Sequence, residues 1–274
     1  MSAHSKDLSQ GNRFEFGKNW QRFLKTIDEA RIAEAERSLT ERLEIENLEG
    51  KSFLDIGSGS GLFSLAARRL GARVHSFDYD AQSVTCTAEL KRRYFSDDVN
   101  WNIEEGSVVD DEYMQSIGKF DVVYSWGVLH HTGDMWQALA NAAIPVANGG
   151  KLFIAIYNDQ GRKSRWWRIV KRWYCNSLAA KILLISVFFP YFFCAGLAVD
   201  VLRGRNPVRR YRDYKKTRGM SVVTDWFDWL GGYPFEVAKP EEIFHFYKAR
   251  GYTLNRLKTC GGGLGNNEFV FVNQ

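Results

Sequence analysis

The chain is poor in cysteine, and the cysteines it has are scattered. Cys86, Cys175, Cys194 and Cys260 form no CxxC pair, so we expect free thiols in a reducing compartment. The polar start, MSAHSKDLSQGN, lacks the apolar core of a secretory signal. We therefore expect a cytoplasmic protein.

Acidic residues are nearly absent from one segment. Residues 159–219 hold fifteen Lys and Arg but only three acids, whereas the rest of the chain holds 22 bases and 29 acids. The formal net charge of +5 thus hides a slightly acidic body and one very basic, aromatic segment. Charge concentrated in this way predicts an anionic partner, such as a lipid head group, a nucleic acid or phosphate.

The remainder alternates between strand and helix patterns. Residues 12–49 are predicted to be helical, because 23–48 have apolar residues at roughly helical spacing and many Glu and Arg pairs. Strand patterns then occur at 51–56, 73–78, 120–126 and 151–157, and helical patterns at 61–71, 81–95 and 135–146. This alternation predicts an α/β fold with a parallel sheet covered by helices on both faces. After the basic segment, a helix at 240–251 and two strands around CGGGLGNN predict an antiparallel β-hairpin at the C-terminus.

A glycine-rich turn follows the first strand. In Asp55-Ile56-Gly57-Ser58-Gly59-Ser60-Gly61 the glycines allow a tight turn and close approach of a ligand to the backbone. The turn lacks Gly-Lys-Ser/Thr, and Asp55 would repel a pyrophosphate, so a cationic amino acid or sulfonium ligand fits better. Asp78 ends the next strand, where a carboxylate can accept hydrogen bonds from both hydroxyls of a ribose.

At these residues the chain resembles the class I S-adenosylmethionine-dependent methyltransferases. FLDIGSGSG, SFDYD, EEGSVVDD, FDVVYSWGVLHH and NGGKLFIAIYN are similar to successive motifs of that family. The resemblance implies a Rossmann-like, seven-stranded, mostly parallel sheet with an antiparallel C-terminal hairpin. It also implies S-adenosyl-L-methionine as the cofactor. The cofactor-binding residues that it implies are Asp55, Gly57, Ser58, Gly59, Gly61, Asp78, Tyr79, Asp110, Ser125 and Trp20.

The loop after the fourth strand supplies candidate catalytic residues. His130 and His131 follow the carboxyl end of this strand, where open α/β sheets bind ligands, and either imidazole is a candidate general base. The alternative is that one of them packs or caps the next helix. Tyr157 and Asn158 end the fifth strand and are expected to face the acceptor, or simply to pack there. Adjacent histidines share no helical face, so we expect no metal site.

Two further features narrow the kind of methyltransferase. The chain has neither an Asn/Asp-Pro-Pro-aromatic tetrad nor a Pro-Cys dipeptide, which argues against the two common nucleic-acid base methyltransferase chemistries. Asn158 and the insertion that follows it resemble the ubiquinone-pathway O-methyltransferases of small hydroxylated aromatics. Lys18 or Trp20, in FEFGKNW, is expected to touch the methionine carboxylate or the substrate, unless this segment is only a surface aromatic helix.

Residues 182–199 form a run of eighteen uncharged, mostly apolar residues. Eighteen helical residues are about 27 Å long, close to the thickness of a bilayer core. A single crossing would separate strands that must share one sheet. Pro190 lies in the middle of the run, so we predict two short helices folded back on each other, 178–189 and 191–202. The preceding RKSRWWRIVKRWY has the composition of a helix at a lipid interface.

Three regions follow from these patterns: an N-terminal helical cap (1–49), a methyltransferase core (50–158 and 239–274) and a helical insertion (159–238). The insertion is a lid over the substrate, a homodimer contact, a peripheral membrane contact through 162–218 or, less expected, a nucleic-acid contact. We expect methyl transfer to an oxygen of a hydrophobic small molecule with a His base. A nucleic-acid methyltransferase and a non-catalytic membrane-surface scaffold are the alternatives.

Overall fold

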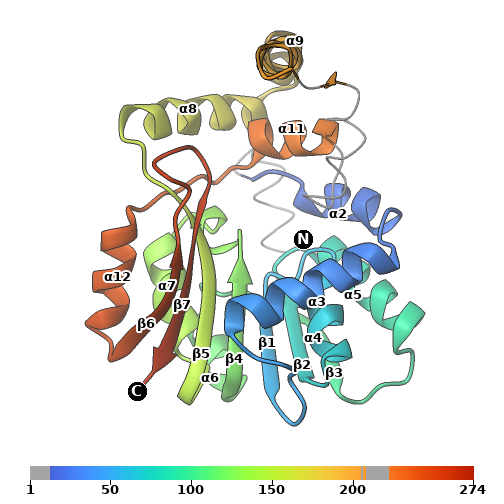
Figure 1. Ribbon diagram of the computed structural model, residues 1–274, viewed down its shortest axis with the longest axis vertical. Helices are drawn as coiled ribbons and strands as arrows, with labels where there is room; N and C mark the ends of the chain where they lie inside the picture. Colours follow the sequence, from blue (N-terminus) through green and yellow to red (C-terminus); the bar gives the residue numbers. More distant parts are fainter. Residues whose placement is uncertain (1–12, 205, 208–221) are drawn as a thin grey trace.

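One seven-stranded sheet forms the centre of the molecule. The computed structural model describes residues 13–204, 206–207 and 222–274. The strands lie in the order β3-β2-β1-β4-β5-β7-β6 (Figure 1). Their bounds are β1 Ser52–Ile56, β2 Arg73–Asp78, β3 Trp101–Glu105, β4 Phe120–Trp126, β5 Val146–Tyr157, β6 Tyr252–Lys258 and β7 Asn266–Asn273. β7 is antiparallel to both of its neighbours, and every other pairing is parallel. The predicted sheet and C-terminal hairpin are confirmed.

Helices cover both faces of the sheet, because buried strands carry apolar side chains on alternating sides. Phe53 packs with one group of helices, α3 Glu29–Leu43, α4 Leu62–Arg69 and α5 Ala81–Tyr94. Its neighbour Leu54 packs on the opposite face with α6 Asp111–Ser116, α7 Met135–Ala143 and α12 Pro240–Lys248. The fold is therefore a three-layer sandwich, as the alternation predicted.

The topology places a ligand site at one edge of this sandwich. From β1 the chain continues to β2 and β3 on one side, and then crosses to β4 and β5 on the other. The carboxyl ends of these parallel strands point toward the helices α2 Phe16–Leu24, α8 Arg162–Asn176 and α11 Val222–Gly231 (Figure 1). Open α/β sheets bind ligands at this type of switch point, outside the carboxyl ends of the strands.

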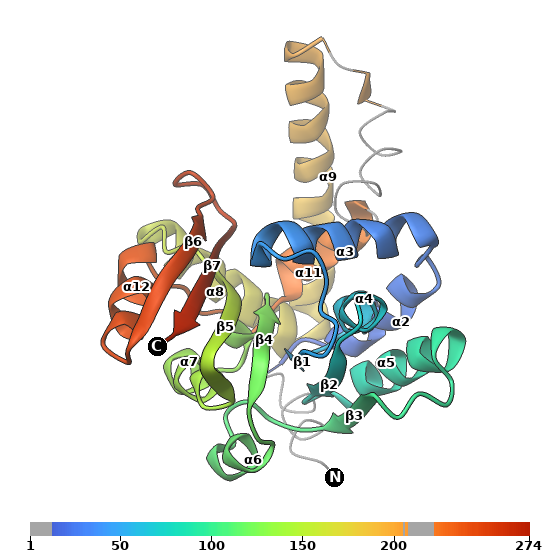
Figure 2. The ribbon, with the colours of Figure 1, turned by 60° about the horizontal axis from the view of Figure 1, so that its bottom comes forward.

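The insertion between β5 and α12 corrects one prediction. Leu178–Leu202 forms a single helix, α9, with Pro190 inside it, so the predicted break into 178–189 and 191–202 is wrong. Pro190 removes only one backbone donor from the helix, and a stripe of side chains on both sides of it packs on the body: Leu184, Ile185, Phe188, Phe189 and Phe192. Figure 2 shows α9 as one continuous helix that projects beyond the body. Residues 203–218, which hold eight of the Lys and Arg of the basic segment, lie mostly outside the described residues.

Candidate active site

The glycine turn between β1 and α4 has a shape that side chains would block. Gly57 and Gly59 have φ angles of +74° and +55°, which side-chain-bearing residues rarely adopt. A Cβ atom on Gly57 would lie 2.4 Å from Cγ1 of Val128, and one on Gly59 would lie 2.9 Å from Cε2 of Trp20. The turn is therefore closely packed from two sides, with the indole of Trp20 against it.

Two carboxylates, the buried Asp55 and the half-buried Asp78, lie beside this turn. Asp78 accepts hydrogen bonds from the backbone N–H groups of Gly59 and Asp80, both at 2.9 Å. Burial raises the pKa of Asp78 to about 6, against the stabilising effect of these two donors. Asp55 accepts a hydrogen bond from the hydroxyl of Ser64, and burial raises its pKa to about 7. Both acids thus lie in a low-dielectric setting where a cation or a hydroxyl donor would be bound strongly.

A cavity of about 1980 Å³ opens over the carboxyl ends of the strands. Typical small-molecule sites measure roughly 300–1,000 Å³, so this one has room for a cofactor and an acceptor together. Most of the cofactor residues expected from the sequence line it: Asp55, Gly57, Ser58, Gly59, Asp78, Tyr79, Asp110 and Trp20. The residues predicted from the sequence to bind the cofactor thus form one wall of the cavity.

Two of the expected cofactor-binding residues, Gly61 and Ser125, do not line the cavity, and neither does Lys18, the alternative to Trp20. Gly61 has a φ of +79° and packs against the backbone of Thr87, so it brings α4 close to α5 rather than lining the cavity. Ser125 is fully buried, and its hydroxyl donates to the carbonyl of Ile56. Lys18 is exposed and forms an ion pair with Glu15.

The two histidines have different surroundings. His131 lines the cavity, and its Nδ1 lies 2.6 Å from the carbonyl oxygen of Pro234. A carbonyl only accepts, so Nδ1 carries the proton and Nε2 keeps its lone pair. His130 is completely buried outside the lining, with its ring 4.1 Å from that of Tyr157. The structure therefore favours His131 over His130 as the candidate base.

Burial keeps both imidazoles neutral. The pKa of His131 is lowered to about 3, mainly by desolvation; the Pro234 hydrogen bond opposes this shift, and the cations Lys171 and Arg13 add to it. The pKa of His130 is also well below its ordinary value, mainly through burial.

Tyr157 and Asn158, at the end of β5, also differ in their surroundings. Tyr157 lines the cavity and packs between the histidines and Phe235. Asn158 does not line it, because its side chain accepts from Asn267 at 3.0 Å and donates to Gly263. Asn158 thus fastens the turn between β6 and β7 to β5.

The structure adds a cavity residue that no sequence motif indicated. Arg13 donates to the carbonyl oxygens of His131 and Thr132, at 2.9 and 3.1 Å, and its guanidinium lies 5.0 Å from the centre of the Tyr79 ring. It therefore ties the segment before α2 to both halves of the site. Only its tertiary position gives it this role.

An apolar wall completes the cavity on the side of the insertion. It is formed by Phe16, Phe192, Trp226 and Trp229, from α2, α9 and α11. Hydrophobic spacing in the sequence could not distinguish these residues from ordinary core. Among residues 13–204, 206–207 and 222–274, no cluster of three His, Cys, Asp or Glu is placed to hold a metal ion.

Comparison with known proteins shows the family of the chain. A family model described as a methyltransferase domain matches residues 27–187, more than half of the chain. The chain belongs to this family, and its fold is that of the class I S-adenosylmethionine-dependent methyltransferases.

Individual relatives match over shorter stretches. The ubiquinone biosynthesis O-methyltransferase of Xanthomonas oryzae pv. oryzae is 32% identical over 112 residues, which is 41% of this chain and 45% of that protein. The protein of the same name from Brucella ovis is 32% identical over 111 residues, or 40% of this chain and 43% of its own length. The alignments thus span less than half the length of these curated relatives.

Solved structures support the fold across nearly the whole chain. A magnesium protoporphyrin IX methyltransferase from Synechocystis, solved with bound SAH, covers 94% of each chain with a TM-score of 0.55 and 14% identity. An O-methyltransferase from Nostoc punctiforme covers 93% of this chain and 60% of its own, with a TM-score of 0.53 and 15% identity.

The residues of the cavity fit S-adenosylmethionine, the cofactor of this class. Gly57, Ser58 and Gly59 line the cavity, so the backbone of the glycine turn is accessible to a ligand. Asp78 would hold the ribose hydroxyls, and Asp55 would favour the cationic methionine end. Val108 and Asp110, after β3, form the adjoining wall.

Proposed function

We propose that the chain transfers a methyl group from S-adenosylmethionine to a hydroxyl oxygen of a hydrophobic small molecule. One observation carries the proposal: a single cavity joins the cofactor residues to an apolar chamber, with His131 in the lining. The curated relatives are named O-methyltransferases, which supports oxygen as the methylated atom.

The cofactor, when bound, supplies an electrophilic methyl group; the protein must orient the acceptor and remove its proton. Nε2 of His131 is suited to accept a hydrogen bond from the acceptor hydroxyl, because the Pro234 carbonyl fixes the proton on Nδ1. A pKa of about 3 makes His131 a weak base toward a free hydroxyl. As the acceptor oxygen bonds to the methyl carbon, however, the sulfur–methyl bond would break and leave a neutral thioether; the hydroxyl proton would then be strongly acidic, and its transfer to Nε2 would be downhill.

The acceptor's class follows from the apolar wall. Phe192 and Trp229 come from the insertion, and Tyr157 from the end of β5. Aromatic side chains bind planar apolar groups by stacking or edge contacts. They also exclude water, which strengthens the hydrogen bond to His131. A hydroxylated aromatic compound with apolar substituents matches this chamber.

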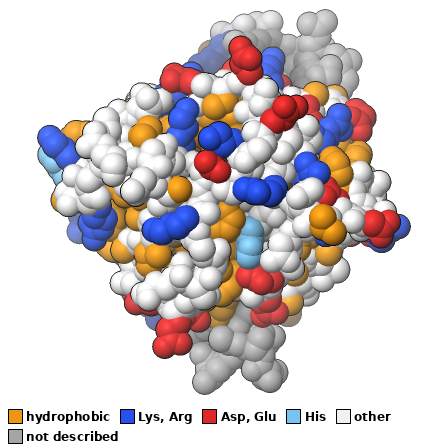
Figure 3. Space-filling model, turned by 90° about the horizontal axis from the view of Figure 1, so that it is seen from below, with side chains coloured by type: hydrophobic (Ala, Val, Ile, Leu, Met, Phe, Trp, Pro, Cys, Tyr) orange, Lys and Arg blue, Asp and Glu red, His pale blue; other side chains and the backbone are white. Residues whose placement is uncertain are grey.

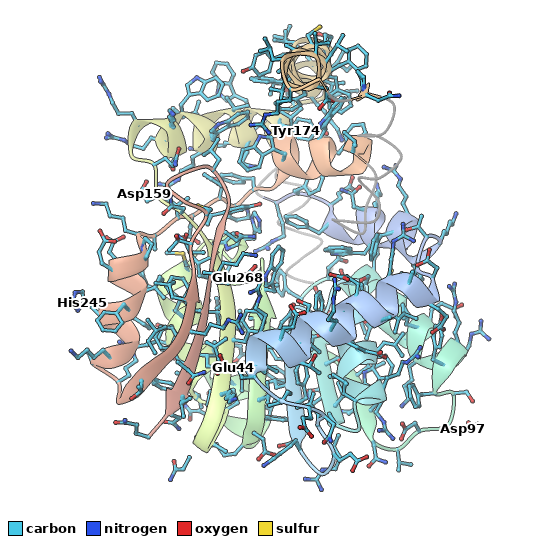
Figure 4. The ribbon with its side chains drawn as sticks, viewed as in Figure 1. Glu44, Asp97, Asp159, Tyr174, His245 and Glu268 are labelled. Carbon is cyan, nitrogen blue, oxygen red and sulfur yellow. The ribbon has the colours of Figure 1, made fainter. Side chains whose placement is uncertain are left out.

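The test measures transfer of labelled methyl groups from the cofactor to a catechol. We expect His131→Gln to lower kcat by about 10²–10⁴-fold, the usual contribution of a general base, with cofactor affinity unchanged. His245→Gln is the matched control, because His245 is exposed on α12, remote from the insertion (Figure 4). A fully active His131→Gln enzyme would remove the assigned base.

The exposed bases Arg162, Lys163 and Arg165 on α8 favour nucleic acid as a second class of acceptor. That alternative predicts RNA or DNA binding whose affinity falls steeply with salt, and labelled nucleic acid as the product. A non-catalytic scaffold would bind the cofactor and label neither kind of acceptor. The same labelling experiment therefore separates all three.

A further inference from the structure

The helix α9 is apolar on the side that faces away from the body as well as on the side that packs. Its outward side carries Ile182, Leu183, Val187 and Tyr191, which are 59%, 63%, 55% and 62% exposed. A surface helix of a soluble protein is polar on its outward side, whereas one that is apolar all round is buried in protein or lipid. Within the described residues, α9 is the one helix whose length and composition would allow it to cross a membrane.

The neighbouring helix α8 has the side chains of an interfacial helix. Trp167, Val170 and Tyr174 face inward, and Figure 4 shows Tyr174 between α8 and α11, beneath α9. The exposed stripe alternates bases with large apolar residues: Arg162, Arg165, Trp166, Ile169, Arg172 and Trp173. Trp at the head-group level and Arg toward anionic lipids are typical of helices that lie on a bilayer.

These features gather at one end of the molecule. α8 and α9 form the top in Figure 1, above the carboxyl ends of the strands. The opposite end, seen in Figure 3, carries acidic and basic side chains interspersed with small apolar spots. From Arg162 to Val199 the chain contains no acidic residue at all. α8 and α9 thus gather exposed apolar and cationic side chains, without acidic ones, at the end where the cavity lies.

A transmembrane arrangement conflicts with the sheet. β5 precedes the insertion and pairs with β7, which follows it, so both ends of the insertion lie on one side of any bilayer. After a crossing by α9, the chain would have to return through the hydrocarbon with the eight Lys and Arg of 203–218. α9 therefore lies along a surface.

A second copy of the chain is a poorer partner for this surface than lipid. A symmetric contact places the same patch on both sides, and this patch has no acidic residue between Arg162 and Val199 to pair with the bases of α8. Anionic head groups are complementary to those bases. The positive charge of α8 therefore favours an anionic bilayer over a second copy of the chain.

The cavity reaches this surface. Phe192 belongs to α9, and its side chain both packs on the body and lines the cavity, together with Trp226 and Trp229 of α11. We infer that α8 and α9 dock on an anionic bilayer with α9 lying in the plane of the interface, and that the acceptor is a lipid-borne hydroxyl compound that enters the cavity from the membrane. The identity of the acceptor rests on the proposed function, whereas the docking does not.

The test uses the full chain and flotation with vesicles of phosphatidylcholine, with or without phosphatidylglycerol. The double variant Leu183→Glu/Val187→Glu places charge on the outward side of α9, and Arg162→Gln/Arg165→Gln removes charge from α8. Val99→Glu is the matched control, because Val99 is 91% exposed near Asp97, at the far end of the molecule from α9 (Figure 4). Methylation of catechol in solution and of dodecylcatechol in vesicles is measured in parallel.

We expect the native chain and Val99→Glu to float with the mixed vesicles. The bound fraction should fall about tenfold in the α9 variant, and the α8 variant should lose its preference for anionic lipid. The α9 variant should methylate dodecylcatechol in vesicles about tenfold more slowly and catechol at the native rate.

Failure of the membrane docking and failure of the proposed function give different results. A native chain that methylates catechol but does not float overturns the docking and leaves the proposed function standing. A chain that floats but labels neither compound refutes the proposed function, and with it the lipid-borne acceptor. A native dimer that the α9 variant converts to monomer, with flotation unchanged, would assign α9 to a second copy and overturn the inference.

Discussion

His131 and Pro234 are 103 residues apart in the chain, yet Nδ1 of the imidazole lies 2.6 Å from the proline carbonyl oxygen. The contact is reinforced nearby, because the N–H of Glu236 donates to the carbonyl of His130 at 2.9 Å. The carboxylate of Glu236 also accepts from the N–H groups of Gly133 and Met135, both at 3.1 Å. The end of the insertion is thus fastened to the histidine loop, and a displacement of the insertion would move His131.

The first prediction concerns the stability cost of keeping His131 neutral. In the unfolded chain a histidine takes up a proton below about pH 6.5, whereas folded His131 does so only near pH 3. The unfolded state therefore binds more protons between these values, and the free energy of unfolding falls as the pH is lowered through 6.5. At pH 5 the loss from one such group is about 2 kcal/mol. Urea unfolding at pH 7.5 and pH 5 should show a smaller drop for His131→Gln, and the native drop for His245→Gln.

The second prediction concerns Asp78 and cofactor affinity. Burial raises the pKa of this carboxyl to about 6, and only the ionised form can accept hydrogen bonds through both oxygens. Cofactor binding should therefore release a proton near pH 6, and affinity should weaken about tenfold between pH 8 and pH 5. Titration calorimetry in buffers of different ionisation enthalpy measures both effects. An affinity that is independent of pH, or that survives Asp78→Ala, would contradict the assigned role.

The third prediction tests the glycine turn. Gly57→Ala combines a φ of +74° with a Cβ 2.4 Å from Val128. It should lose roughly 1–2 kcal/mol of stability to backbone strain and about 1–3 kcal/mol more to overpacking. Gly118→Ala is the matched control, because Gly118 has a φ of +87° with nothing within 4 Å of a built Cβ. Cofactor binding should be abolished in the first variant and native in the second; equal losses would show that packing at this turn is unimportant.

The sequence predicted the parts of the site that depend on local backbone. Gly57 and Gly59 directly follow β1, and Asp78 ends β2, so parallel pairing of these two successive strands brings them together. The C-terminal hairpin was predictable from two strand patterns and the glycine-rich turn between them. Ser125 and Asn158 stand in the expected positions along their strands, but their side chains are directed into hydrogen bonds that only the assembled sheet reveals.

The remainder of the site depends on contacts between distant segments. The carbonyl of Pro234, near the C-terminal end of the insertion, orients the imidazole of His131, which distinguishes it from His130 as the candidate base. Arg13 acquires partners only when the N-terminal segment folds over the site. No periodicity or motif encodes such contacts, because each needs the position of a segment far away in the chain.

The fourth prediction concerns Arg13. Its two hydrogen bonds to the loop carbonyls, and its position over Tyr79, hold the N-terminal segment against residues that flank Asp78. Arg13→Met should therefore weaken cofactor binding about tenfold, because a charge-assisted hydrogen bond contributes roughly 1.5–3 kcal/mol. Arg22→Met, at an exposed position of α2, should bind as the native chain does. Titration calorimetry measures the cofactor affinity of both variants. An Arg13→Met variant that binds the cofactor as tightly as Arg22→Met would contradict the role of Arg13.

The last prediction tests the continuity of α9 through Pro190. The proline has no N–H to donate to the carbonyl of Ser186, one turn earlier, and the helix persists because packing of Phe188, Phe189 and Phe192 holds its axis. Pro190→Ala should restore that donor and stabilise the helix by up to about 3 kcal/mol. Hydrogen exchange of residues 186–194 should therefore slow, and vesicle binding should not change. Ser186→Ala leaves every backbone donor in place and should exchange at the native rate. If instead the chain turned back on itself at Pro190, alanine would straighten it, and vesicle binding would change along with exchange.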